Sequence, residues 1–153
     1  RGNMATEEIN PMPYEYPDLK KVRFIYAASA EHQLYVQCYT QYDLMTICDF
    51  NGNLKCNIYG PKWVNEKTQT QHYSLGVEFC GDKILALYSG GDHRTDAYYP
   101  TKFLVFDLNG NYLKTLETGY MITDFCYDKE NNRLIINLND EIQFAYLDLE
   151  GII

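Results

Sequence analysis

Residues 103–116 read Phe-Leu-Val-Phe-Asp-Leu-Asn-Gly-Asn-Tyr-Leu-Lys-Thr-Leu. The Asn109-Gly110 pair in this stretch lies between two runs rich in apolar residues. Asn-Gly is the strongest short-range signal for a β-hairpin, because both central residues of a type I′ turn need positive φ. We therefore expect strands over 103–106 and 112–116, joined by a tight turn.

The same turn pattern occurs three times along the chain. Each copy consists of an Asp, an apolar residue, a polar residue and a Gly, and the copies lie at 49–52, 107–110 and 148–151. An Asp that precedes a tight turn accepts hydrogen bonds from nearby backbone N–H groups. We therefore interpret Asp49, Asp107 and Asp148 as turn residues.

Each turn belongs to a longer unit with further strand-like runs upstream. The units span 22–59, 73–117 and 121–153. Each unit predicts four antiparallel strands in a meander, although the third ends too soon after its turn to contain a fourth strand. Four-stranded units of roughly 40–50 residues are typical of β-propeller blades.

The predicted fold class is all-β, because no stretch shows a helical period over about 11 or more residues. Propellers close with about 4–8 blades, so three units predict half of a six-bladed propeller. A missing N-terminal half or a second copy of the chain would complete the ring. The alternative is a β-sandwich of about ten strands, and the repeated Asp-x-x-Gly turn favours the propeller.

Residues 1–21 differ from the rest of the chain, because they contain Pro11, Pro13 and Pro17. Proline removes a backbone donor and disfavours helix in the residue before it, so we expect an extended segment leading into the first unit. Residues Met12 to Tyr16 are a candidate for the missing outer strand of the third unit, because sheet edges need to be covered. Residue 1 is Arg, so we expect a fragment of a longer protein.

The composition limits the function classes. Thirteen Lys and Arg against 21 Asp and Glu give a formal charge of −8, which argues against nucleic acid as the main partner. An aromatic content of 15% argues against disorder. No apolar run approaches the ~18 residues of a transmembrane segment.

The five cysteines form no Cys-x-x-Cys pair, which argues against a zinc ribbon or a thioredoxin-like motif. Each lies inside a strand-like run, so we interpret them as buried free thiols. They are Cys38, Cys48, Cys56, Cys80 and Cys126.

The most unusual segment is the loop 89–100, Ser-Gly-Gly-Asp-His-Arg-Thr-Asp-Ala-Tyr-Tyr-Pro, and loops on a rigid scaffold often carry binding residues. Asp92, His93 and Asp96 are residue types that bind divalent metals. Their spacing matches no established site, so a solvated polar loop is the simpler interpretation and no metal site is predicted. Asp92 and Arg94 are expected to form a surface ion pair.

Aromatic residues form a second candidate site. Tyr98 and Tyr99, together with Trp63 and Tyr59, would offer a platform for a sugar or a peptide. The competing interpretation is packing between adjacent blades. Trp63 lies in the polar segment 60–71 and is expected to anchor this connection between the first two units.

The sequence contains no recognisable catalytic motif. The patterns Gly-x-Ser-x-Gly, Gly-x-x-x-x-Gly-Lys and Gly-x-Gly-x-x-Gly are absent. His32 and His72 stand near expected strand starts and are not predicted to act as bases. No catalytic residue and no cofactor is therefore predicted.

Three stretches carry a resemblance to a known family: 106–116, 125–135 and 144–151. Together they resemble the TolB-like six-bladed β-propeller proteins of the envelope of Gram-negative gut anaerobes, and the likeness covers about residues 22–153, as the C-terminal half of such a protein. The resemblance implies a periplasmic or lipid-anchored location and a binding scaffold, and it supplies no catalytic residues.

Three functions follow as expectations. The first is a non-catalytic scaffold for a protein or another envelope component. The second is a propeller that binds or processes carbohydrate, suggested by the tyrosine content and acidic charge. The third is a purely structural half-propeller that forms a homodimer. The ligand-binding residues expected under the first two are Asp92, His93, Tyr98, Tyr99 and Trp63.

Overall fold

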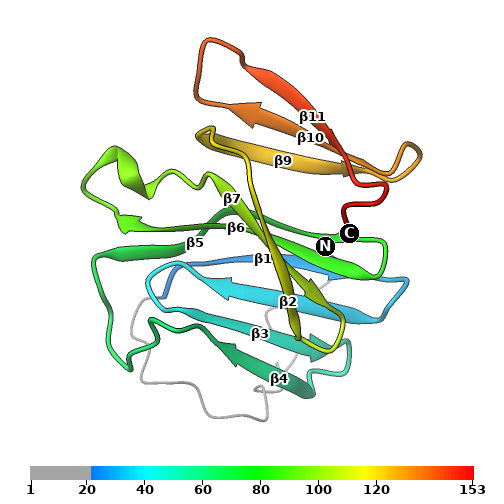
Figure 1. The fold of residues 1–153 in the computed structure, drawn as a ribbon. Helices are drawn as coiled ribbons and strands as arrows, with labels where there is room; N and C mark the ends of the chain where they lie inside the picture. The colour runs from blue at the N-terminus through cyan, green and yellow to red at the C-terminus, as the bar shows by residue number, and fades with distance from the viewer. Residues whose placement is uncertain (1–21) are drawn as a thin grey trace, which may run out of the picture.

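The computed structural model describes residues 22–153, and over this range the chain is all-β (Figure 1). The predicted extended segment 1–21, with the candidate strand Met12 to Tyr16, lies outside the described residues. The strands form three antiparallel sheets, each a meander in sequence order. Sheet 1 contains β1 (Phe24–Ser29), β2 (Leu34–Tyr39), β3 (Leu44–Asp49) and β4 (Leu54–Tyr59). Sheet 2 contains β5 (Thr70–Cys80), β6 (Lys83–Asp92), β7 (Lys102–Asp107) and β8 (Tyr112–Glu117). Sheet 3 contains β9 (Ile122–Asp128), β10 (Arg133–Leu138) and β11 (Phe144–Asp148).

The repeated turn joins the third and fourth strands of sheets 1 and 2. In sheet 1 the Asp49 carboxylate accepts hydrogen bonds from the backbone N–H groups of Asn51 and Asn53, at 2.9 Å each. The Gly52 N–H donates to the Asp49 carbonyl oxygen at 3.1 Å. These bonds confirm that Asp49 is a turn residue and lower the pKa of its carboxyl group, with the Asn53 amide side chain as the largest cause.

The type of turn differs from the prediction. Gly52 and Gly110 have positive φ, +83° and +85°, whereas the asparagine before each of them does not. The β3–β4 register also shifts beside the turn, between Ile47 and Cys48. The loop is therefore a type I turn followed by a left-handed glycine and a bulge, rather than the two-residue type I′ turn expected from Asn-Gly.

The second copy of the turn repeats the first. The Asp107 carboxylate accepts from the N–H groups of Asn109 and Asn111 at 2.9 Å each, which confirms its role. In the third copy Asp148 ends β11 and Gly151 has φ +72°. The Asp-x-x-Gly pattern thus marks the end of the third strand in every sheet.

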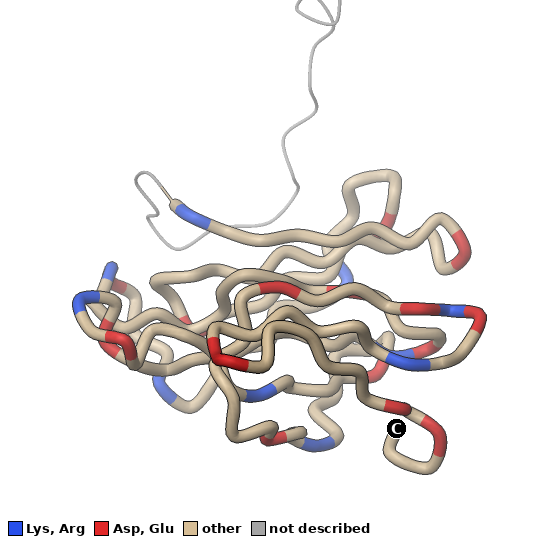
Figure 2. Tube along the Cα trace, turned by 90° about the horizontal axis from the view of Figure 1, so that it is seen from above, with Lys and Arg blue, Asp and Glu red and all other residues tan. Residues whose placement is uncertain are grey.

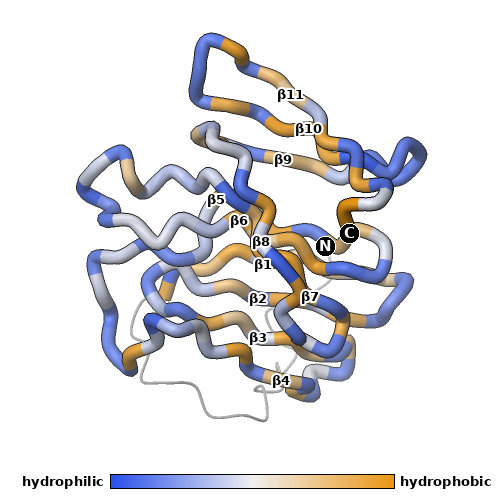
Figure 3. Tube along the Cα trace, viewed as in Figure 1, coloured by the Kyte–Doolittle hydropathy of each residue, from blue (hydrophilic) through white to orange (hydrophobic). Residues whose placement is uncertain are grey.

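The sheets stack face to face, with sheet 2 in the middle and its inner strand β6 buried on both faces. In β6, Ile84 and Ala86 pack into the core shared with sheet 1, whereas Leu85 and Leu87 pack into the core shared with sheet 3. An uninterrupted apolar run suits a strand that is covered on both sides. Figure 3 shows the apolar segments gathered along the strands and the polar ones at the loops.

The cysteine prediction is correct for most of the thiols but wrong for one. Cys38, Cys48 and Cys80 are buried, and Cys56 is half-buried. Cys126 is exposed, because it lies on the face of β9 that points away from sheet 2. Burial raises the pKa of the Cys38 and Cys80 thiols above the usual range.

Charged residues occupy mainly the loops at the two ends of the sheets (Figure 2). Within 22–153 no helix is long and apolar enough to span a membrane.

Candidate functional site

Three connecting segments meet at one end of sheets 1 and 2. The β2–β3 loop contacts the β4–β5 connection through Gln41 and Thr68, whose side chains each bond the other's backbone oxygen at 3.4 Å. The β6–β7 loop contacts the same connection, because the His93 N–H donates to the Gln69 oxygen at 3.0 Å. Most of the residues proposed from the sequence as binding residues lie at this end.

The polar residues of the β6–β7 loop bind one another and the neighbouring connection. Asp92 and Arg94 form the predicted ion pair, with 2.6 Å between Arg94 Nη2 and Asp92 Oδ2. Hydrogen bonding to Arg94 lowers the pKa of Asp92 below its usual range. His93 Nδ1 lies 3.0 Å from the Gln69 oxygen and 3.9 Å from Asp92 Oδ1. In the described part of the chain, no three or more His, Cys, Asp or Glu side chains gather in a metal-binding arrangement.

The predicted aromatic platform is two separate ring pairs. Tyr98 and Tyr99, at the 3₁₀ helix η2 (Asp96–Tyr98), stack with centroids 4.3 Å apart. Trp63 packs edge-on against Tyr59 at 4.9 Å and contacts Tyr42 at 6.0 Å. Between described residues no ring contact joins the two pairs. Trp63 anchors the β4–β5 connection, as predicted.

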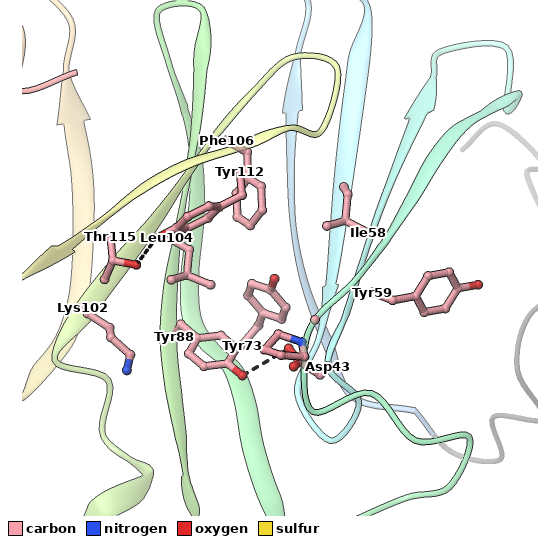
Figure 4. Close-up of a pocket in the computed structure, with 12 residues that line it drawn as sticks. Asp43, Ile58, Tyr59, Tyr73, Tyr88, Lys102, Leu104, Phe106, Tyr112 and Thr115 are labelled. Carbon is pink, nitrogen blue, oxygen red and sulfur yellow. Dashed lines mark hydrogen bonds between the residues drawn. The ribbon is translucent and has the colours of Figure 1, made fainter.

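A cavity of about 420 Å³ lies next to this end, between sheets 1 and 2 (Figure 4). Its volume falls within the range of small-molecule sites. Ile58 and Tyr59 of β4 line one side, and β7 and β8 line the other with Leu104, Phe106 and Tyr112. Tyr73, Tyr88 and Asp43 close its base, and Lys102 and Thr115 complete the β7–β8 side.

The base of the cavity is a buried polar network around Asp43, which is only 1% exposed. The Tyr88 hydroxyl donates to Asp43 Oδ1 at 3.2 Å, and the Lys62 backbone N–H donates to Oδ2 at 2.9 Å. His72, 2% exposed, places Nδ1 3.2 Å from the Tyr88 hydroxyl oxygen and 3.8 Å from Asp43 Oδ1. Both carboxylate oxygens thus have partners, as a buried charge requires.

The protonation states of this network follow from its geometry. Burial lowers the pKa of His72, and Asp43 offsets only part of that effect. The imidazole is therefore neutral near pH 7, and a proton on Nδ1 lets it donate to the Tyr88 oxygen while Tyr88 donates to Asp43. Burial also raises the pKa of Tyr88 well above its usual range, with the Asp43 charge as a further cause. The network is a fixed scaffold of neutral donors around one carboxylate.

Gly60 allows the connection to approach Asp43. A Cβ atom at Gly60 would lie 2.1 Å from the Asp43 carboxylate, so no other residue fits without displacing it. The Gly60 N–H also donates to the Asp43 carbonyl oxygen at 2.8 Å. Gly60 therefore lets the start of the β4–β5 connection lie directly against the β2–β3 loop.

Lys102 gives the cavity its cation. Its Nζ lies 5.7 Å from the centre of the Tyr88 ring, within the range of a cation–π contact. The ion pairs among the described residues do not include Lys102. The arrangement combines aromatic and aliphatic walls with one ammonium group that has no carboxylate partner in the described range.

Sequence reasoning missed most of this site. It assigned no role to Asp43. It correctly placed His72 near a strand start, since β5 begins at Thr70, but it gave His72 no partner. The network joins residues up to 45 positions apart, which lie in two connections and two strands. Local spacing contains no signal for such contacts, and only the Gly60-Pro61 pair marks the place where the chain turns tightly past Asp43.

No protein-family model matches this sequence, and a search of curated proteins finds no significant match.

Proposed function

We propose that the three sheets are blades of a β-propeller and that the chain forms half of a six-bladed ring of the TolB-like type. The three antiparallel meanders, stacked face to face with the same strand order, support this assignment. The resemblance over 106–116, 125–135 and 144–151 adds the envelope as the proposed location. A second copy or a missing N-terminal half would complete the ring.

Light scattering on a sizing column tests how the ring is completed. The subunit mass is 17.9 kDa. A mass of twice this value that persists on dilution supports closure by two copies, and a monomer supports association with a missing half.

The function that the site supports best is a non-catalytic binding scaffold whose ligand enters the cavity between sheets 1 and 2. One observation carries this proposal: the cavity has aromatic and aliphatic walls, and its cation, Lys102, has no carboxylate partner in the described range. Each carboxylate oxygen of Asp43, at the base, already has a hydrogen-bond partner, so its proposed role is to hold the base of the cavity in place. Such a cavity suits an apolar or aromatic group that carries a negative charge, on a protein or another envelope component.

The test compares two probes of the same shape, 2-naphthoate and its neutral amide, by isothermal titration and saturation-transfer NMR. Naphthoate should bind roughly tenfold more tightly than the amide, because a charge-assisted contact is worth about 1.5–3 kcal/mol when buried and less at a half-exposed site. The Lys102→Met variant should remove this preference. Lys67→Met, an exposed lysine on the β4–β5 connection, is the matched control. Binding of neither probe, or a preference that survives Lys102→Met, would refute the cavity as the site.

Carbohydrate binding is the second candidate. Tyr59 and Tyr112 are 52% and 56% exposed and stand on opposite sides of the cavity. Exposed tyrosine rings present large rigid faces with a polar tip, which suits a sugar ring. A glycan panel should then give a ligand whose affinity falls on Tyr112→Ala, and a panel without binding or cleavage would remove this candidate.

A further inference from the structure

Sheet 3 has an open edge at β11. Sheets 1 and 2 each have a fourth strand, β4 and β8, paired with the third strand. In sheet 3 the third strand is β11, and no described strand pairs with its other edge. A strand edge of this kind is a template for pairing with another strand.

The hydrogen-bond pattern shows which backbone groups point outward. The Leu138 N–H donates to the Gln143 oxygen, and the Leu149 N–H donates to the Asn132 oxygen, at 2.8 and 3.0 Å. Bonded and non-bonded pairs alternate along an antiparallel ladder. Because β10 and β11 pair without a register shift, Ala145 and Leu147 bond to β10. The backbone N–H and C=O groups of Phe144, Tyr146 and Asp148 therefore point toward the open edge.

A groove of about 480 Å³ runs beside this edge, between sheets 2 and 3. Its apolar lining continues the packed core between these sheets, and includes Leu116, Ile136, Leu138, Ala145 and Leu147. The groove thus offers one apolar wall on which alternate side chains of an added strand would pack. It lies on the other face of sheet 2 from the cavity described above, so the present inference is independent of the proposed ligand site.

Acidic side chains stand at both ends of the open edge. Asp140 and Glu141 lie in the loop before β11, and Asp148 and Glu150 lie at its end. All four are exposed. These charges favour a partner with basic residues beyond its apolar ones, because opposite charges at a rim steer association.

We propose that sheet 3 binds an extended peptide segment of a partner protein by β-strand addition at β11. The segment pairs with the outward backbone groups of Phe144, Tyr146 and Asp148, places small aliphatic residues at alternate positions in the groove, and carries Lys or Arg near its ends. This mode takes its affinity from main-chain hydrogen bonds and its specificity from the alternating side chains. β4 and β8 show that this fold accommodates a fourth strand at the equivalent position.

The first experiment uses the full chain and a fluorescent heptapeptide, acetyl-Lys-Val-Thr-Val-Thr-Val-Lys-amide, with fluorescence anisotropy as the readout. The control peptide has the same side chains but an N-methyl group on every residue amide, so neither of its edges can donate hydrogen bonds to a strand. The unmodified peptide should bind at least tenfold more tightly than the control. Equal affinities, or no binding by either peptide at millimolar concentration, would overturn the proposal.

Amide hydrogen exchange locates the bound peptide. The amides of Phe144, Tyr146 and Asp148 should exchange fast in the free protein and slowly with the peptide, while those of Ala145 and Leu147 are protected in both. Slow exchange at the first three amides without peptide would mean that another part of the chain already covers the edge. Protection that grows with protein concentration would mean that a second copy covers it. Either result would overturn the proposal.

Two variants at one position isolate the backbone contribution. Tyr146→Ala removes the side chain and keeps the N–H, whereas Tyr146→Pro removes the outward N–H and leaves the bonds of Ala145 and Leu147 to β10. The dissociation constant of Tyr146→Pro should exceed that of Tyr146→Ala at least tenfold. Equal constants in two variants with the same thermal midpoint would contradict strand addition. If Tyr146→Pro does not fold, the N-methyl peptide still decides.

Discussion

The Asp43→Ala variant should lose more stability than a variant in which any exposed Asp or Glu is replaced by Ala. The change removes the acceptor of the Tyr88 hydroxyl and of the Lys62 N–H, at 3.2 and 2.9 Å. Hydrogen bonds to a charged acceptor contribute about 1.5–3 kcal/mol each, and the half-buried Lys62 N–H belongs at the lower end. We expect a loss of about 3–5 kcal/mol in the free energy of unfolding, which lowers the melting midpoint by roughly 6–20 °C.

Urea denaturation followed by the fluorescence of Trp63 measures this loss, since Trp63 is the single tryptophan and packs in the β4–β5 connection. A double-mutant cycle with Tyr88→Phe isolates the pair. The coupling energy should be about 1.5–3 kcal/mol, because the double variant no longer contains the buried Tyr88 donor facing an absent acceptor. Asp82→Ala, at an exposed carboxylate, is the control and should leave the midpoint unchanged. A loss below about 1 kcal/mol, or strict additivity in the cycle, would refute the reasoning.

Three further predictions follow from burial. Burial lowers the pKa of His72, so below about pH 6.5 the unfolded chain binds more protons than the folded one. The free energy of unfolding should therefore fall as the pH drops through that value. Urea midpoints measured from pH 8 to 5 should show this decrease, and His72→Gln should reduce it. Leu85→Ala should reduce the free energy of unfolding by about 3–5 kcal/mol, because Leu85 is fully buried. Leu113→Ala, at an exposed position of the outer strand β8, should change it by under about 0.5 kcal/mol. Equal losses in urea denaturation would contradict the packing of sheet 2. In the monomeric chain, Cys126 should react with Ellman's reagent within minutes, and Cys80 only after unfolding. In the closed ring proposed above, the neighbouring half would cover this face of β9, so Cys126 should then be protected.

The local features of the fold were predictable from the sequence. The Asp-x-x-Gly repeat located the end of the third strand in every sheet, because a short-range turn depends on the residues inside it. The apolar run 84–88 indicated a strand, but not that alternate residues serve two different cores. The turn type was wrong, because Asn-Gly also fits a type I turn with a glycine bulge when an Asp carboxylate takes the N–H groups of the residues after it, as at Asp49.

The candidate site was predictable only in part. The loop 89–100 and Trp63 drew attention for their composition, and both lie at the end of the molecule next to the cavity. The network of Asp43, His72 and Tyr88 was not predictable, because it depends on how one sheet stacks on the next. Cys126 shows the same limit, since its neighbours in sequence resemble those of the buried thiols.

The two-sided burial of β6 has a consequence for how this protein evolves. Ile84 and Ala86 pack against sheet 1, and Leu85 and Leu87 pack against sheet 3. Neighbouring residues of β6 are thus selected for packing in different cores, while residues far apart in the chain are selected together because they share one core. Among homologous sequences, we expect residue 85 to covary with Leu134 or Phe125 of sheet 3, and residue 84 with residues of sheet 1.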